Sequence, residues 1–245
     1  MAIVESKEER TGLHDHRPTQ SRDGSGTLPM AATNTNSKPS PATHARAADA
    51  VQLQAAQERI ELYALLAILL RQPPNAELLA SLAAITLPAA AADEPELTSA
   101  WRRLQAAAQK ADPAAVNDEF HDLFIGMGRG EVLPYASWYV AGFLMDRPLV
   151  ALRSDLARLG ITRSDDNKDP EDHAAALCET MALLADPLDG VNTQEQRQFL
   201  LMHMAPWLGR LWADITNASS ADFYRAVAAL GAAFFAVEQS WLNLP

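Results

Sequence analysis

The 245-residue sequence has a single cysteine, Cys178, and no long uninterrupted apolar segment. A lone cysteine cannot form an intrachain disulfide, so nothing indicates an oxidising compartment, and we expect Cys178 to be a buried side chain. The first residues, MAIVESKEER, carry charges where a secretory signal would place an apolar core of roughly 7 to 15 residues. No later segment reaches the roughly 18 apolar residues of a membrane span. We therefore expect a cytoplasmic protein without stable membrane insertion.

Motifs that would indicate an enzyme are also absent. The chain has no G-x-x-x-x-G-K-[ST] phosphate loop, no G-x-S-x-G elbow, no H-E-x-x-H motif and no Glu-x-x-His pair of a di-iron bundle. Asp118 and His121 form one Asp-x-x-His, which is more typical of a surface pair than of a metal site. The glycine-rich segment 126–130 resembles a phosphate-binding loop, but it follows a predicted helix and not a strand, and no lysine comes directly after it. The sequence therefore predicts no catalytic residue, no metal and no cofactor.

Basic residues are scarce, with 20 against 31 acidic residues and a net charge of -11. Residues 1–50 hold six of each sign, so the whole acidic excess lies in residues 51–245. An acidic body repels nucleic acid and anionic lipid and attracts basic ligands. We expect no nucleic-acid partner, and a basic peptide is a natural ligand. The alternative is that the acidity only maintains solubility.

The first part of the chain differs in composition from the rest. Residues 1–45 have no aromatic side chain, are rich in Ser, Thr, Asn and Pro, and show no apolar period. Such a segment cannot bury enough apolar surface to fold. We predict a disordered tail over residues 1–47 and one folded domain over residues 48–245.

In residues 48–245 the apolar side chains recur with helical spacing between Pro, Gly, Asp and Asn. No segment alternates with a period of two. The pattern predicts helices over 51–71, from 75, from 93, over 112–124, from 137, over 148–159, from 169, from 193 with a kink at Pro206, and over 223–241. The expected fold is all-α, a single bundle of about nine helices.

For three of these helices the sequence also predicts the start, the cap or the buried face. The run Asp169–Asp172 combines an N-cap, a proline and acids, and predicts that a helix begins there. Thr193 and Gln196 are a candidate capping box. In the last helix one apolar stripe is expected to face the core. Its members are Phe223, Val227, Leu230, Phe234, Val237 and Trp241.

Three short elements occur in a fixed order within this acidic helical body. The first is an aromatic-Leu-Phe helix end, a glycine-containing loop and a Pro-aromatic-x-Ser element; the second is PEDH at 170–173; the third is His-x-x-Pro-Trp. The residues that carry the first and third elements are Phe120, Leu123, Phe124, Pro134, Tyr135 and Ser137, and His203, Pro206 and Trp207. Over roughly residues 51–241 the chain resembles the TorD/DmsD/NarJ family of redox-enzyme maturation chaperones.

This resemblance implies an all-helical cytosolic chaperone that is not an enzyme. Such a protein binds the leader peptide, the apo catalytic subunit of a molybdopterin oxidoreductase, or both, and assists cofactor insertion and assembly before export. Formate dehydrogenase is one client that we consider. The sequence leaves monomer and dimer both open.

The resemblance and the chemistry of the ligand together suggest a site. A twin-arginine leader places two guanidinium groups beside an apolar segment, so its receptor needs a carboxylate next to an aromatic or aliphatic groove. Asp172 is the first choice of carboxylate, and Phe124, Pro134 and Tyr135 are the first choices for the groove. The full candidate peptide-binding set is Phe120, Leu123, Phe124, Glu131, Pro134, Tyr135, Ser137, Glu171, Asp172 and His173.

Other interpretations stay open for the same residues. PEDH could instead form a helix cap with a buried His173 bonded to backbone, and the secondary motif of His203, Pro206 and Trp207 could be core packing. A second function class is a helical enzyme with a metal or small-molecule site that uses His121, His173 and His203. A third is a passive assembly factor that holds a mature subunit without recognising a leader.

Overall fold

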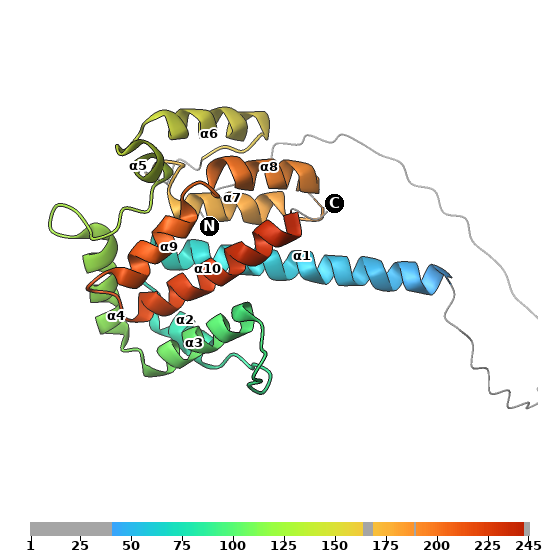
Figure 1. The fold of residues 1–245 in the computed structure, drawn as a ribbon, viewed down its shortest axis with the longest axis horizontal. Coiled ribbons are helices and arrows are strands. Elements are labelled where there is room, and N and C mark those ends of the chain that lie inside the picture. Colours follow the sequence, from blue (N-terminus) through green and yellow to red (C-terminus); the bar gives the residue numbers. More distant parts are fainter. Residues whose placement is uncertain (1–40, 164–168, 189, 243–245) are drawn as a thin grey trace, which may run out of the picture.

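The computed structural model describes residues 41–163, 169–188 and 190–242 (Figure 1). Within these ranges the regular structure is helical, with ten α-helices and one π-helical turn, and Tyr135 and His173 form an isolated β-bridge. The all-α prediction is therefore confirmed. Of the predicted tail, residues 1–40 lie outside the described residues. The first helix begins at Pro41, ahead of the start expected at Val51, because the alanine-rich run that follows favours a helix.

The bounds of the elements follow the chain. They are α1 (Pro41–Arg71), α2 (Ala76–Ala83), α3 (Glu96–Lys110), α4 (Pro113–Phe120), the π-helical turn η1 (His121–Ile125), α5 (Ala136–Ala141), α6 (Arg147–Arg158), α7 (Ala174–Leu184), α8 (Thr193–His203), α9 (Leu208–Asn217) and α10 (Phe223–Leu242).

The two long helices, α1 and α10, run through the middle of the body (Figure 1). Helix α1 packs along α7, while α10 packs against α3 and α9; α2 lies on α3, and α5 lies on α6. In Figure 1 the pair α5 and α6 lies at one end of the body and the pair α2 and α3 at the opposite end. None of the helices in the described ranges has the length and apolar content that crossing a membrane requires.

A buried polar network ties α1 to α8 and α10. The two carboxylate oxygens of Glu238 accept from Arg59, at 2.6 Å from Nε and 2.8 Å from Nη2. The hydroxyl of Tyr63 donates to the same carboxylate at 2.9 Å, and Nη1 of Arg59 donates to Gln196 at 3.0 Å. The guanidinium also stacks on Trp241, 4.0 Å from the ring centroid. The pair tolerates burial because its hydrogen-bonding groups have partners.

A second buried carboxylate fixes the start of α10. Glu119 accepts hydrogen bonds from the backbone N–H groups of Asp222, Phe223 and Tyr224 at 2.7, 3.0 and 2.8 Å. The first amides of a helix have no partner within the helix, and they carry the positive end of its dipole. Glu119 therefore acts as an N-cap supplied by α4, more than 100 residues earlier in the chain.

Two predicted helix starts differ from the structure. Helix α7 begins at Ala174 with His173 as its N-cap, because the carbonyl of Asp172 accepts from Ala136 N–H and so does not take part in a helix. Helix α8 is capped by Asn192, which accepts from Glu195 N–H, so the proposed capping box at Thr193 is wrong by one residue. The expected kink at Pro206 is confirmed as a break between α8 and α9.

The stripe on α10 is only partly confirmed. Its first four members are buried, but Val237 is 46% and Trp241 is 38% exposed. In the last turns the buried positions are Glu238 and Leu242. From Phe234 onward the buried positions on this face are thus four residues apart. One of them is Glu238, which a search for apolar residues does not find. Cys178 is buried, as expected, and burial raises the pKa of its thiol to about 12.

Candidate functional site

Two of the sequence elements meet in space at one junction. Tyr135 and His173 form the isolated antiparallel bridge. On either side of it, Ala136 N–H donates to the carbonyl of Asp172 at 2.9 Å, and Ala174 N–H donates to the carbonyl of Pro134 at 2.8 Å. The Pro-aromatic-x-Ser element and the PEDH element are therefore joined through backbone, and the junction fixes where α5 and α7 begin.

Asp172 lies inside this junction and is completely buried. Its Oδ2 accepts from the N–H of Ser137 at 2.8 Å, in the first turn of α5. Its Oδ1 has no hydrogen-bond partner in the described part of the chain. Ser137 is buried as well, and its Oγ accepts from Met145 N–H at 3.1 Å. The expectation of an accessible carboxylate at Asp172 is thus wrong for this conformation, since the side chain points inward and holds α5.

His173 is the N-cap of α7. Its Nδ1 accepts from Ala175 N–H at 3.0 Å, which places the ring proton on Nε2, and the ring packs edge-on against Tyr135 at 4.9 Å. Burial, followed by the nearby Arg71, lowers the pKa of His173 to about 3, so the ring is neutral at physiological pH. This confirms the alternative of a helix cap with a buried histidine. Burial, together with Asp169 and Asp172, raises the pKa of the half-buried Tyr135 to about 12.

The other candidate carboxylates are engaged within the protein. Arg153 donates to Glu171 at 3.0 and 2.8 Å; burial alone would raise the pKa of Glu171, but these bonds outweigh it and the pKa is lowered. Glu131 accepts from the backbone and hydroxyl groups of Ser219 and Ser220, and the hydrogen bonds from Ser220 and Ser219 lower its pKa. Glu131 thus connects the loop before α5 to the turn before α10.

The apolar residues of the first element lie in the core. Phe120 packs on Phe124 at 5.1 Å, and Phe124 packs edge-on against Tyr224 of α10 at 5.4 Å. Leu123 and Pro134 are buried too. The expectation that Phe124 and Pro134 line an open groove is therefore wrong, because both are buried and Tyr224 of α10 packs on Phe124.

The glycine-rich loop closes on itself after this core segment. Gly126 adopts a φ of 61°, a left-handed conformation that ends η1. At Gly130 a Cβ atom would approach the carbonyl oxygen of Leu123 to 2.5 Å, so the returning backbone requires glycine. Val132 N–H then donates to that carbonyl at 2.8 Å. The loop is thus a structural turn that delivers the chain to Pro134.

The third element lines a cavity. His203, Pro206 and Trp207 form one wall of a cavity of about 150 Å³ whose other walls come from α5 and α6, including Val140 and Leu152. The ring of Trp207 is buried and donates from Nε1 to the carbonyl of His203 at 2.7 Å. The sequence element is therefore both core packing and cavity wall.

Nε2 of His203 lies 2.8 Å from Oδ2 of Asp155 and ties α8 to α6. Burial alone would raise the pKa of Asp155, but the bonds with His203 and Arg158 outweigh it, so the pKa is lowered. This contact holds α6 over the cavity.

Exposed apolar residues occur in α5, in α6 and in the turn between them, and sequence reasoning missed them; of the exposed apolar residues, Val140 and Met202 line the cavity. Phe143 is 71% and Met145 is 68% exposed in the turn between α5 and α6, where Met145 has a φ of 58°. The signal in the sequence was the run Phe-Leu-Met after Gly142, which no buried helix face requires. We call the following residues the α5–α6 band: Val140, Phe143, Leu144, Met145, Val150 and Met202. Exposed apolar surface gathered in one place marks an interaction site more often than scattered single residues do.

The histidines of the enzyme alternative have separate structural partners. His121 is exposed, and its Nδ1 contacts the carbonyl of Asn117 at 2.8 Å, while His173 and His203 have the partners given above. In the described ranges no group of three His, Cys, Asp or Glu side chains is arranged to hold a metal ion.

Comparisons with known proteins give a family match that spans the three elements. Residues 90–213 match the family described as "Nitrate reductase delta subunit", a range that contains all three elements. The chaperone protein TorD of Vibrio cholerae is 29% identical over 134 residues, which is 51% of this chain and 61% of that protein. TorD of Vibrio atlanticus is 25% identical over 156 residues, 60% of this chain and 72% of that protein. TorD of Vibrio parahaemolyticus is 26% identical over 134 residues, 51% of this chain and 62% of that protein.

The match to the Vibrio cholerae protein thus spans less than two thirds of that relative's length. The family match covers about half of the present chain. With the all-α fold and the joined sequence elements, it shows that the chain belongs to the nitrate reductase delta subunit family, the group of NarJ- and TorD-type chaperones.

Proposed function

We propose that this protein is a cytoplasmic molecular chaperone that binds the apo catalytic subunit of a molybdopterin oxidoreductase and assists its assembly. Family membership and relatives named as chaperones support this proposal. The observation that carries it is the α5–α6 band, because a chaperone needs apolar surface that stays exposed until the client arrives.

The band and its cavity suit an incompletely folded polypeptide. An apolar client side chain would enter the cavity between Val140 and Met202, and neighbouring client residues would cover Phe143 and Met145. Flexible methionine side chains adapt to different partners. Burial of each such side chain contributes about 1.5–3 kcal/mol, so a few contacts suffice for reversible binding.

Within this proposal the junction of residues 134–137 and 172–174 supports the band. The buried Asp172 fixes the first turn of α5, and Ser137 fixes Met145. Tyr135 is the member of the junction that is half exposed, and Glu131 lies at the surface. We therefore include leader binding in the proposal, with Tyr135 as the contact beside the band. Formate dehydrogenase is one client that the proposal includes.

The test compares binding of a purified client subunit, with and without its leader, to wild type and to a Phe143→Ser/Met145→Ser variant. We expect the variant to lose at least about tenfold in affinity for either form of the client, since two exposed anchors are removed. Val51→Ser in α1 is the matched control, because Val51 is 69% exposed and lies outside the band. Equal affinities of all three proteins would refute the proposed surface. If the client without its leader binds as tightly as the client with its leader, the protein holds a mature subunit without recognising a leader.

A further inference from the structure

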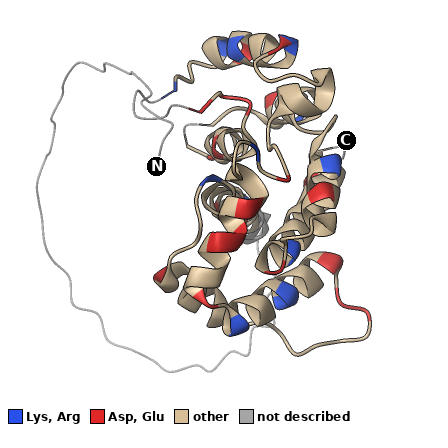
Figure 2. Cartoon of the chain, turned by 90° about the vertical axis from the view of Figure 1, so that its left-hand side faces the viewer, with Lys and Arg blue, Asp and Glu red and all other residues tan. Residues whose placement is uncertain are grey.

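The exposed side of α6 carries basic and apolar side chains and no acidic one. In Figure 2, α6 is the helix at the top, and most of its coloured segments are blue. Asp155 is the acidic residue of this helix, and it is half-buried beside His203 of α8. The exposed residues of α6 are Arg147, Val150, Ala151, Arg153, Ser154, Ala157 and Arg158. This side of α6 is therefore basic in a body whose overall charge excess is acidic.

Two of these arginines lie further out than the carboxylates that they bind. The side chain of Arg153 is 53% exposed, against 13% for its partner Glu171. The side chain of Arg158 is 48% exposed, against 24% for Asp155 and 34% for Glu195. Arg153 donates to Glu171 from Nε and Nη2, so among the described residues its Nη1 has no acceptor. A ligand that approaches α6 therefore meets guanidinium groups before carboxylates.

Arg147 connects this basic side to the α5–α6 band. Its guanidinium has no partner among the described residues. Phe143 and Met145 of the band precede it by four and two residues, and Val150 follows it by one helical turn on the same side. Asp146, between Met145 and Arg147, is the N-cap of α6 and accepts from the amide of Arg147. Its carboxylate is thus used at the helix start, and the surface combines apolar side chains with positive charge.

We infer that the α5–α6 band, together with the exposed side of α6, binds a client segment whose apolar side chains lie between acidic ones. The inference deepens the proposed function and rests on it for the place of binding. Arg147 and Arg158 are eleven residues apart on one side of the helix, which is about 17 Å. An extended segment spans that distance with about five residues. Its two end carboxylates would bind these arginines, and the apolar residues between them would cover Val150.

Charge determines which segment fits this side of α6. The planar guanidinium of arginine binds a carboxylate through two parallel hydrogen bonds. The net charge of -11 opposes an acidic ligand at long range. At physiological ionic strength, however, charges more than about 8 Å away are largely screened, so on contact the nearby arginines have the larger effect. A leader with an arginine pair has the same sign as this surface, so the segment belongs to the mature part of the client.

The shape of the surface favours a polypeptide over an anionic lipid surface. The cavity of about 150 Å³ that Val140 and Met202 line can hold one side chain, and a flat layer of headgroups offers nothing to fill it. A second copy of the chain carries the same net charge of -11, which opposes its approach. Residues 1–40 of this chain hold five acidic and five basic residues, so they offer no net complement.

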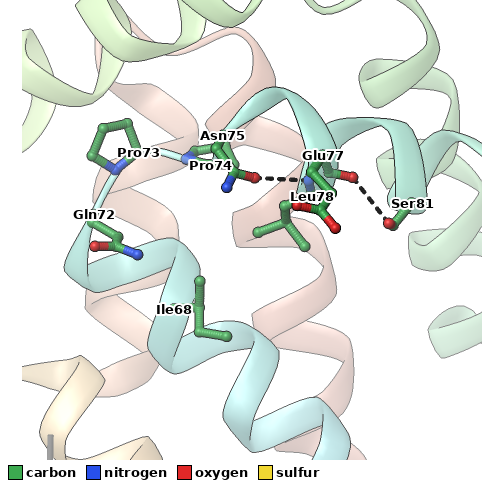
Figure 3. Close-up of a pocket in the computed structure, with 8 residues that line it drawn as sticks. All are labelled: Ile68, Gln72, Pro73, Pro74, Asn75, Glu77, Leu78 and Ser81. Carbon is green, nitrogen blue, oxygen red and sulfur yellow. Dashed lines mark hydrogen bonds between the residues drawn. The ribbon is translucent and has the colours of Figure 1, made fainter. Parts of the chain in front are cut away.

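The cavity between α1 and α2 provides a contrast, because it is apolar without being basic. Figure 3 shows Ile68 of α1 and Leu78 of α2 at this cavity, with Glu77 beside them. None of the described residues that line it is basic. Ile68 is 43% exposed, so it matches the apolar residues of the band in accessibility but lacks their basic neighbours. It therefore supplies a control position for the experiment.

The experiment measures binding of two synthetic peptides to the full-length protein by fluorescence anisotropy at physiological ionic strength. The acidic peptide has two glutamates spaced by about five residues with leucines between them. The control peptide has glutamines in place of the glutamates. We expect the protein to bind the acidic peptide about fivefold more tightly than the control peptide, because exposed ion pairs each add a modest gain. Equal binding of the two peptides would overturn the inference.

Charge variants locate the site. Arg147→Gln/Arg158→Gln should remove the preference for the acidic peptide, whereas Arg103→Gln/Lys110→Gln in α3 should retain it. Both pairs are exposed, so both variants change the net charge equally. If the α3 variant also removes the preference, only net charge matters and the site is refuted. Because Arg158 also binds Asp155, Arg147→Gln is measured alone and should weaken the acidic peptide about twofold.

Apolar variants and cross-linking identify the occupant. Phe143→Ser/Met145→Ser should weaken both peptides, whereas Ile68→Ser should leave both unchanged. A photo-reactive phenylalanine analogue at Ala151 should cross-link to the acidic peptide. Cross-linking to a second copy or to residues 1–40 instead would overturn the inference. So would phosphatidylglycerol vesicles that bind the protein through the same arginines and displace the peptide, because the ligand would then be a membrane.

Binding of the purified client separates this inference from the proposed function. If Phe143→Ser/Met145→Ser loses client binding and Arg147→Gln/Arg158→Gln keeps it, the inference fails and the proposed function stands. If the Phe143/Met145 variant keeps client binding, the proposed function fails whatever the peptides show. Loss of client binding in both variants supports both.

Discussion

At the scale of single residues, the junction shows how buried polar side chains position an exposed surface. Asp172 and His173 are adjacent in sequence but cap different helices: Asp172 caps α5 and His173 caps α7. Neither is available to a ligand in this conformation, because both are buried. Their position within a family element is thus explained by architecture, because they fix the starts of α5 and α7.

The capping role of Asp172 predicts a loss of stability on mutation. Asp172→Ala removes the acceptor for Ser137 N–H and leaves that amide buried, which should lower the free energy of unfolding by about 1–3 kcal/mol. Asp172→Asn retains an acceptor and should cost less. Urea unfolding measures both. A direct role in charge recognition would instead appear as weakened, salt-sensitive client binding by the Asn variant at unchanged stability.

The depressed pKa of His173 predicts acid sensitivity. Its folded-state pKa of about 3 lies below the ordinary 6.5, so between these values the unfolded chain binds a proton that the folded chain does not. Stability contributed by the neutral ring is therefore complete above pH 6.5 and falls as the pH decreases toward 3. From pH 7 to pH 5 the loss is about 2 kcal/mol. Urea unfolding of His173→Asn, which can still cap α7, should show a pH dependence smaller by that amount; an identical dependence would contradict the assignment.

At the scale of elements, long-range polar contacts decide where helices begin and how they align. Glu119 of α4 caps α10, Glu131 holds the turn before it, and Glu238 of α10 binds Arg59 of α1. These contacts join the two central helices to the loops that lead into α5. Breaking these contacts should lower the stability of the helical body without changing the residues of the α5–α6 band.

The buried pair Arg59 and Glu238 can be tested with a double substitution. Glu238→Gln leaves the Arg59 guanidinium without its counter-charge in a buried site and should cost about 3–5 kcal/mol. Replacing both residues by apolar ones, as Arg59→Met/Glu238→Leu, should recover most of that loss because no unpaired charge remains. Thermal and urea unfolding give both values. A double variant less stable than Glu238→Gln would show that Tyr63 and Gln196 depend on the charged pair.

At the scale of the whole molecule, the net charge and the distribution of charges affect the binding of basic segments in different ways. In the view of Figure 2, acidic residues in red and basic residues in blue are interspersed over the body. The net charge of -11 still produces a long-range attraction for basic segments. Specific recognition then depends on the local groups at the binding surface.

This separation predicts a kinetic effect of salt. The association rate with a basic segment of the client should fall several-fold between low and physiological ionic strength, whereas the dissociation rate should change less, because steering acts before contact. Stopped-flow fluorescence measures both rates. The same peptide with glutamines in place of its basic residues is the control, and both of its rates should change little. Equal salt dependence of the two peptides would mean that the net charge does not steer the encounter.

Local sequence patterns determined the fold class and most of the helices. Apolar periodicity, the proline and glycine breaks and the Asp112–Pro113 start act between residues a few positions apart, so they are visible in the chain itself. The same holds for the burial of Cys178 within an apolar helix and for the three ordered elements that identified the family.

Only the tertiary structure decided which faces are covered. Asp172 points inward because residues 134–136 pair with its backbone, Phe124 is covered by α10, and α7 starts late for the same pairing. Phe143 and Met145 stay exposed because no helix within the described ranges packs over that turn. Helical periodicity specifies that a side chain has an apolar neighbour, but not which distant segment supplies it. Burial, buried ion pairs and exposed apolar bands are set by contacts between residues far apart in sequence, and these are fixed only when the whole chain packs.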